Sequence, residues 1–350
     1  MSENVLKRNS LETETLDENT LFVPVKIDET ESEHIASEPY SYWKSVFRVF
    51  IKRPAAIVAL VSLALFILAI IIIPAVAPEW AFTTHVTDAQ KTATGVTKNM
   101  APSWFQWVEI TTADGTTMSV LRWHFFGTDQ IGRDLFYSCF AGAQKSIILG
   151  LISSAIVIFI GTLAGLAWGY FRRLDPIFIE IYNLISNVPS LLLYMLLATV
   201  LKEAFPEMIP EVRLVISLTI LGWVGISLTI RNLVLIISNR EYNVASITLG
   251  TPPLRIMIKN FLPFLMGVII TDISLLIPGM ISSEVSMSYF GLGLDTQALS
   301  IGAILNLGIS MFDQYPWQLL APGGVLAWII FTFFLLGTTL SDALDPKTHR

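Results

Sequence analysis

Long uncharged apolar stretches constrain this chain more than any other feature of its sequence. A membrane-spanning helix needs about 20 predominantly apolar residues, and six stretches reach that length with at most one charged residue inside. They are Ala55–Val76, Ser146–Phe171, Ile181–Leu201, Leu214–Ile237, Phe261–Ser283 and Leu319–Leu340. The pattern predicts an all-α polytopic membrane protein with six transmembrane helices.

A seventh charge-free stretch, Gln297–Phe312, is shorter and contains glycine, so we expect a surface or re-entrant helix there. The composition agrees with a membrane protein, because only 14% of the residues are charged and the mean hydropathy is +0.63. A net charge of -6 does not provide the basic face of a nucleic-acid-binding protein. The single cysteine, Cys139, excludes a disulfide framework within the chain and a multi-cysteine metal site.

Lys and Arg are distributed unevenly between the predicted loops. With the N-terminus inside, the short inner loops contain Arg172, Arg173, Arg255 and Lys259, whereas the outer loop 284–318 contains no Lys or Arg. Because cytoplasmic loops carry an excess of these residues, both termini are predicted to be cytoplasmic.

This topology divides the chain into five parts. They are an acidic cytoplasmic tail (1–41), a region with the first span (42–77), an extracellular extension (78–140), a core with spans two to six (141–345) and a short cytoplasmic tail (346–350). In the extension, Trp104, Trp107 and Trp123 are expected to form a small core or to anchor it at the membrane surface.

The loop 238–263 between spans four and five, SNREYNVASITLGTPPLRIMIKNFLP, is predicted to contain a short helix. Ser238 and Glu241 have the spacing of a capping box, which predicts the helix start. Gly250 accepts the left-handed conformation that ends many helices. Pro252 and Pro253 then favour a new helix, because proline is accepted in the first turn.

The predicted helix, Asn239–Leu249, carries Tyr242, Ala245 and Leu249 on one face. This narrow apolar stripe fits the bilayer surface and a docking partner equally well.

The sequence EYNVASITLGTPPLRIMIKNFLP resembles the EAA loop of ABC importer permeases, whose pattern is EAA, three residues, Gly and a later Leu-Pro. Val244, Ala245 and Ser246 stand at the EAA positions, and Gly250 stands at the glycine. This chain departs from the pattern at Val244 and Ser246, and also at Asn260, which takes an apolar place.

The resemblance extends over most of the chain, from residue 42 to the C-terminus. The stretches FGTDQIGRDLFYSCFAGAQKSIILG, GYFRRLDPIFIEIYNLISNVPSLLL, SYFGLGL, YPWQLLAPG and SDALDP are similar to blocks of the dipeptide/oligopeptide permease family. Glu241-Tyr242 and Arg255-Ile256 resemble the loop variant typical of peptide importers. Together these stretches most resemble the C-type permease subunit of oligopeptide importers.

The resemblance implies a type I ABC importer permease in a bacterial cell membrane, with the loop helix docked on a cytoplasmic ATPase. The implied partners are a second permease subunit in a heterodimer, two cytoplasmic ATPases, an extracellular peptide-binding protein and the peptide. ATP and Mg²⁺ would be bound by the ATPases, since this chain has no Walker A motif, no cofactor and no catalytic residue of its own. The residues implied in ATPase coupling are Glu241, Tyr242, Val244, Ala245, Ser246, Gly250, Pro252 and Arg255.

Polar residues surround Pro189 on the predicted third span. Pro189 should kink this helix and leave backbone carbonyls that a cavity or neighbouring helices must satisfy. Asn183, Asn187 and Tyr194 are therefore candidates for the translocation path, with ordinary helix packing as the alternative.

Carboxylates mark further candidate positions. Asp272 lies inside span five, where an ionisable group is a functional candidate that lines the path or pairs with the partner subunit. Glu284 lies at the outer end of that span and suits a hydrogen-bonding role or the path. Asp129, Arg133 and Asp134 fit a metal or phosphate site less well than a loop braced by ion pairing. The small residues of GTLAGLAWG are expected at the interface with the partner permease.

Other functions are consistent with part of these features. A permease of the same family could carry dipeptides, nickel or another small solute. An ion-coupled secondary transporter should show paired inverted repeats with broken helices, and only Asp272 suggests one. A membrane enzyme would need a Ser/His pair or a zinc motif, neither of which the sequence contains. The coupling-loop match favours the importer permease.

Overall fold

The computed structural model describes residues 42–82, 97–111, 115–294 and 299–344. The predicted tails, 1–41 and 346–350, lie outside these ranges. The chain divides after Ser45 into two units, and the described part of the first is the start of α2 (Tyr42–Lys52). The second unit runs from Val46 onward.

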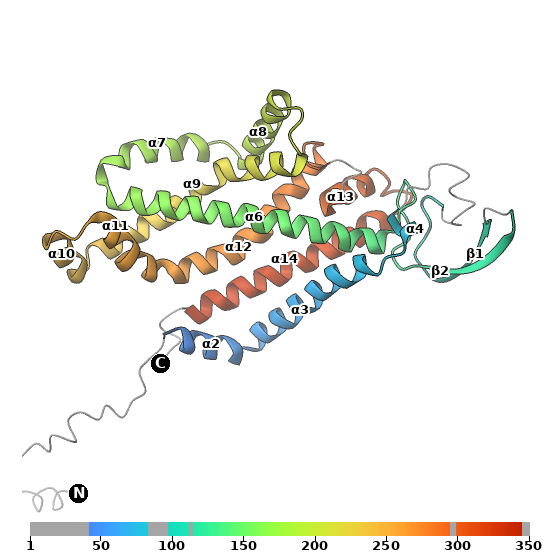
Figure 1. The fold of residues 1–350 in the computed structure, drawn as a ribbon, viewed down its shortest axis with the longest axis horizontal. Helices are drawn as coiled ribbons and strands as arrows, with labels where there is room; N and C mark the ends of the chain where they lie inside the picture. Colours follow the sequence, from blue (N-terminus) through green and yellow to red (C-terminus); the bar gives the residue numbers. More distant parts are fainter. Residues whose placement is uncertain (1–41, 83–96, 112–114, 295–298, 345–350) are drawn as a thin grey trace, which may run out of the picture. The chain divides into compact units, whose positions relative to one another are not determined.

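The described part of the second unit contains five long apolar helices, which confirm the helical, polytopic membrane fold. They are α3 (Pro54–Ala75), α6 (Leu135–Tyr170), α9 (Pro210–Ser238), α12 (Leu262–Tyr289) and α14 (Trp317–Leu344). α12 continues without a break from α11 (Pro253–Ile256) through a π-helical turn, Met257–Phe261. These long helices run side by side (Figure 1).

The third predicted span is two helices rather than one. α7 (Asp175–Ser186) and α8 (Ser190–Ala204) meet at an angle of 90°. The sequence predicted one kinked helix over 181–201, whereas the structure has a complete break between two helices. Pro189 lacks an amide hydrogen and disfavours helical backbone in the residue before it, so α7 ends and α8 begins with Pro189 at its N-cap.

α6 begins well before the predicted start of span two at Ser146. Asp134 caps it by accepting hydrogen bonds from the amides of Phe136 (2.9 Å) and Tyr137 (3.3 Å). The charge on Lys145 made the apolar stretch look shorter, but this side chain pairs with Glu211 at 2.6 Å. α6 therefore continues through Lys145, although the charge at this position suggested that the span begins after it.

The glycines of GTLAGLAWG pack against α9 of the same chain, so the prediction that they face a partner permease is wrong. A Cβ atom on Gly165 would lie 2.6 Å from the Cβ of Ile230 and 2.7 Å from the carbonyl oxygen of Ser227. Gly161 and Gly169 approach α9 as closely. Without these glycines α6 and α9 could not come so near each other.

A two-stranded hairpin departs from the all-α prediction. β1 (Ser103–Thr111) pairs antiparallel with β2 (Thr117–His124) at the end of the long helices opposite α10 (Glu241–Thr248) (Figure 1). Trp104 and Trp107 are 75% and 70% exposed, so they do not form a core of this extension.

Two short helices complete this end of the molecule, α4 (Glu79–Phe82) and α13 (Ile301–Ile309). α13 is the helix predicted within 297–312. Its residues Ile301, Ile304 and Leu305 are buried, which favours the re-entrant alternative over the surface one.

Candidate coupling and translocation site

The loop helix α10 starts differently from the prediction. α9 continues through Ser238, whose hydroxyl donates to the carbonyl oxygen of Leu235 at 3.1 Å. α10 begins at Glu241, with Arg240 at the N-cap and no side-chain cap. The predicted capping box is therefore wrong, because the serine hydroxyl is already engaged inside the preceding helix.

The end of α10 confirms the predicted stop. Gly250 has φ 78°, and its amide donates to the carbonyl oxygen of Ile247 at 3.0 Å. The amide of Thr251 donates to Ser246 at 3.1 Å, which completes a Schellman motif. Pro253 then occupies the first turn of α11, as predicted. α10 is therefore a short helix with a defined end.

An asparagine pair joins α10 to the helices on both sides of it. Asn243 is fully buried, and its Nδ2 donates to the carbonyl oxygen of Ile237 in α9 at 2.8 Å. Its Oδ1 accepts from Nδ2 of Asn260 at 2.9 Å. Asn260 lies in the π-helical turn that leads into α12, a type of turn often found at functional sites.

This pair gives the departure at Asn260 a physical reason, because a buried amide needs a partner. Sequence reasoning missed Asn243. Two asparagines on either side of the Gly-Thr-Pro-Pro break were a signal, but the sequence did not show that they meet.

An apolar core secures the same junction. Ile256, Phe261 and Leu265 are completely buried and share a cluster with Ile230 and Val234 of α9. The α10 segment is thus bounded by two helices that pack on each other. A displacement of α10 that keeps the Asn243 hydrogen bonds therefore acts on α9 and on the turn that leads into α12.

The outward face of α10 is open in this chain. Tyr242, Val244 and Leu249 are 53%, 47% and 85% exposed. Of the predicted coupling residues, Glu241, Tyr242, Val244, Ala245, Gly250, Pro252 and Arg255 are exposed and Ser246 is half-buried. Seven of the eight predicted residues are therefore accessible in this chain, and their role in coupling stays a prediction.

The predicted path residues fall into two environments. α7, all of which is described, buries none of its side chains, and Asn183 is exposed, as is Asn187 just beyond its end. Tyr194 of α8 is buried instead, in a cluster with Leu214 and Met280.

The two carboxylates of α12 also differ. Glu284 is buried and accepts from the hydroxyls of Ser146 (2.9 Å) and Ser288 (3.1 Å), as expected for a structural role. Ser146 also accepts from the amide of Ile301, so this group joins α6, α12 and α13. Asp272 has a buried Oδ2 atom without a hydrogen-bond partner among the described residues.

An ion pair that sequence reasoning missed holds α7. Arg231 of α9 donates through Nη2 to both carboxylate oxygens of Asp175, at 2.6 and 2.8 Å. The indole nitrogen of Trp168 donates to the same carboxylate at 2.7 Å, and the guanidinium lies 5.4 Å from the Trp168 ring centroid. This group ties the start of α7 to α6 and α9. Arg231 contributed only to the charge count in the sequence.

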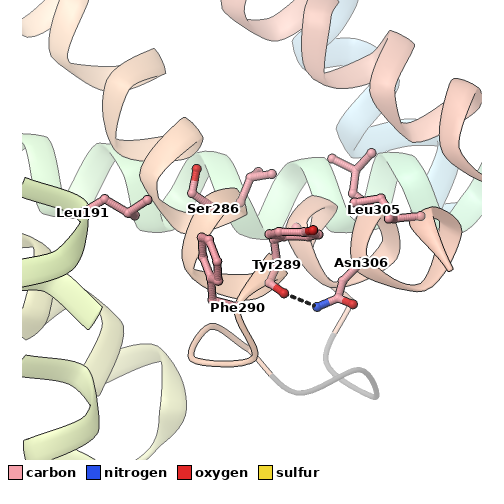
Figure 2. A pocket seen from close by; sticks show the side chains of 9 residues that line it. Leu191, Ser286, Tyr289, Phe290, Leu305 and Asn306 are labelled. Atoms are coloured by element: carbon pink, nitrogen blue, oxygen red, sulfur yellow. Dashed lines mark hydrogen bonds between the residues drawn. The ribbon is translucent and has the colours of Figure 1, made fainter. Parts of the chain in front are cut away.

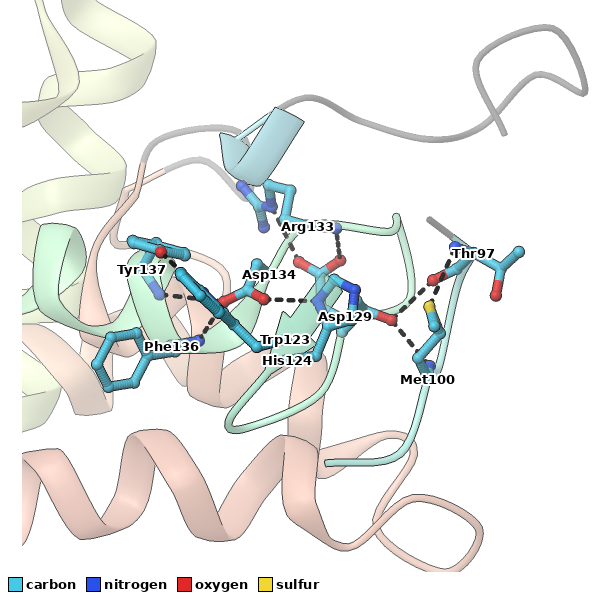
Figure 3. A network of polar contacts seen from close by, with 10 residues as sticks. Thr97, Met100, Trp123, His124, Asp129, Arg133, Asp134, Phe136 and Tyr137 are labelled. Atoms are coloured by element: carbon cyan, nitrogen blue, oxygen red, sulfur yellow. Dashed lines mark hydrogen bonds and ion pairs between the residues drawn. The ribbon is translucent and has the colours of Figure 1, made fainter. Parts of the chain in front are cut away.

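A buried polar network holds the base of the hairpin (Figure 3). Arg133 donates to Asp129 at 2.9 Å, which confirms the predicted braced loop. His124 Nδ1 lies 2.7 Å from Asp134, the residue that caps α6. Within the described ranges no group of three or more His, Cys, Asp or Glu side chains could hold a metal ion.

Comparisons with known proteins agree with this architecture. Residues 144–350 match the family described as "Binding-protein-dependent transport system inner membrane component", and residues 41–102 match the "N-terminal TM domain of oligopeptide transport permease C". The oligopeptide transport system permease protein AmiD of Streptococcus pneumoniae is 33% identical over 93% of this chain and 96% of its own length.

Two relatives from Bacillus subtilis are also similar. The oligopeptide transport system permease protein OppC is 31% identical over 94% of this chain and 98% of its own length. The dipeptide transport system permease protein DppC is 36% identical over 65% of this chain and 70% of its own length. The family match covers the helices that form the site, and the chain belongs to the family of inner-membrane components of binding-protein-dependent transport systems.

Proposed function

We propose that this chain is a permease subunit of an ATP-driven importer that moves oligopeptides into the cytoplasm. The observation that carries the proposal is the α10 segment, a short helix with an exposed outward face and a buried amide connection to α9 and to the turn that leads into α12. The names of the similar permeases, which specify oligopeptide transport, support the substrate class.

In this proposal the chain has no ATPase site. Two cytoplasmic ATPases bind ATP and Mg²⁺, and one of them receives the exposed face of α10. A second permease subunit completes the path, and an extracellular binding protein delivers the peptide. The chain lies in the bacterial plasma membrane with α10 and both termini on the cytoplasmic side.

The geometry supplies a route for the motion. Closure of the ATPases displaces α10, and the Asn243–Asn260 pair and the core around Phe261 carry that displacement into α12. The Arg231–Asp175 pair carries the accompanying movement of α9 into α7. The path alternates between inward-open and outward-open states because these helices move together.

Dipeptides are the second candidate substrate, favoured by the similarity to a dipeptide permease. Transport of labelled oligopeptides and dipeptides by the complete complex in proteoliposomes distinguishes the two. ATP-dependent uptake of oligopeptides supports the proposal, and uptake of dipeptides alone favours the second candidate.

The variant Gly250→Val tests the role of α10. A β-branched residue at φ 78° is strained, so we expect the helix end to distort and peptide uptake to be lost while the chain still inserts into the membrane. Gly115→Val is the matched control, since Gly115 has φ 77° and open space around it but lies next to the hairpin. Full uptake by Gly250→Val, or equal loss in both variants, would contradict the proposed role.

A further inference from the structure

A cavity of about 460 Å³ lies between α8, the last turns of α12 and α13 (Figure 2). Its walls include the aliphatic side chains of Leu191, Val285 and Leu305, and the aromatic rings of Tyr289 and Phe290. The volume is in the range of small-ligand sites, which are commonly about 300–1,000 Å³.

The lining of this cavity is uncharged and mostly apolar. None of its residues is Asp, Glu, Lys or Arg. The hydroxyl of Ser286 donates to the carbonyl oxygen of Ser282 at 2.8 Å, and the amide of Asn306 donates to Ser288 and Tyr289 at 2.6 and 3.1 Å. These polar donors are used within the chain, so the cavity favours an apolar group and disfavours a charged one.

The walls of the cavity are held in place. A Cβ atom on Gly302 would lie 2.8 Å from the Cβ of Ser288, so α13 lies directly against α12. The start of α13 is fixed by Ser300, which accepts from the amide of Ala303, and by the buried Glu284 group beneath it. A preformed wall reduces the ordering that a ligand must impose.

The position of the cavity relates it to transport. Leu191 follows the 90° break between α7 and α8, next to the exposed Asn187. α12 forms one wall at its outer end, and its other end follows the π-helical turn that contains Asn260, which bonds to α10. A movement of α12 driven from α10 therefore changes the cavity directly.

We infer that this cavity receives an uncharged apolar side chain of the incoming peptide, of the size of leucine or phenylalanine, at the external end of the path. The inference rests on the proposed peptide import and adds a site of side-chain selection to it. Burying such a side chain should make a peptide that carries it bind roughly tenfold more tightly than the same peptide with alanine at that position.

The inference can be tested with a substitution that fills the cavity in the complete complex. Ser286→Phe adds a ring inside it, and Ser283→Phe is the matched control, because Ser283 also lies on α12, also donates to the carbonyl four residues earlier, and does not line the cavity. Proteoliposomes containing both permeases, the ATPases and the binding protein are given trialanine or Ala-Phe-Ala. The binding protein is the same throughout, so its preference cancels when each variant is compared with wild type.

We expect Ser286→Phe to lower uptake of Ala-Phe-Ala about tenfold and to leave trialanine uptake and the Ser283→Phe control unchanged. Tyr289→Ala removes an exposed wall without adding bulk, so it should lower the ratio of Ala-Phe-Ala uptake to trialanine uptake. This variant covers the case in which Ser286→Phe does not assemble. An unchanged ratio in both cavity variants, as expected if a lipid chain fills the cavity, would overturn the inference. Equal loss for both peptides would also overturn it. Absence of ATP-dependent trialanine uptake by the wild type would instead refute the proposed function.

Discussion

The helix pair α6–α9 and the broken pair α7–α8 lie in the same chain but use their surfaces in opposite ways. α6 brings glycines against Ile230 and Val234 of α9, and both of these side chains are completely buried. α7 buries none of its side chains and is attached through Asp175 to Arg231. The contrast indicates that α6 and α9 form a scaffold by close packing within one chain, whereas the side chains of α7 are left accessible to lipid, to the path or to another subunit.

The largest loss of stability is expected from a substitution in the contact between α6 and α9. Gly165→Val places atoms where the Ile230 side chain and the Ser227 carbonyl already lie, so we expect a loss of about 3 kcal/mol in stability. Thermal unfolding of the purified chain in detergent measures it. Gly225→Ala on α9 is the control, because a Cβ atom there meets nothing within 4 Å. Equal stability of the two variants would show that α6 and α9 do not depend on close contact.

A smaller effect is expected at the connection between the two regions. Asp175→Asn removes the ion pair with Arg231. The Arg231 side chain is 17% exposed and the Asp175 side chain is 30% exposed. Solvent screening limits the loss to about 1 kcal/mol, and high salt should reduce the difference from wild type. Glu180→Gln, an exposed change on the same helix, is the control. A salt-independent loss would assign the effect to packing rather than to charge.

The smallest effect on stability is expected on α7 itself. Asn183 is exposed, so Asn183→Ala should change the unfolding free energy of the isolated chain by less than about 0.5 kcal/mol. If α7 faces the partner permease or the path, the same change should reduce peptide uptake by the assembled complex. Unchanged uptake and unchanged complex stability would remove Asn183 from the translocation path.

Much of the fold could be predicted from sequence, because membrane spans and helix stops depend on local composition. The apolar stretches identified the long helices, and Gly250 with Pro252-Pro253 identified the end of α10 and the start of α11. The start of α6 was missed because Lys145 is compensated by Glu211, which is distant in sequence. The hairpin was missed because its strands expose aromatic side chains instead of alternating them with polar ones.

The site could be predicted only where its residues are neighbours in sequence. The exposed residues that we predict to act in coupling come from one loop, but the Asn243–Asn260 and Asp175–Arg231 contacts form only after the chain turns and packs. The environment of Tyr194 likewise depends on α9 and α12, whose side chains enclose it. Pairwise contacts of this kind require the tertiary structure.

In the mechanism that we propose, α10 moves α12 through the Asn243–Asn260 pair. The most direct test is the number of peptides transported per ATP hydrolysed by the reconstituted complex carrying Asn243→Ala, Asn260→Ala or both, with the exposed Asn239→Ala as the control. We predict that each single change lowers this ratio by roughly fivefold, and that the double change is no worse than the more severe single change. Unchanged ratios in the single variants, or losses that multiply in the double variant, would contradict the claim.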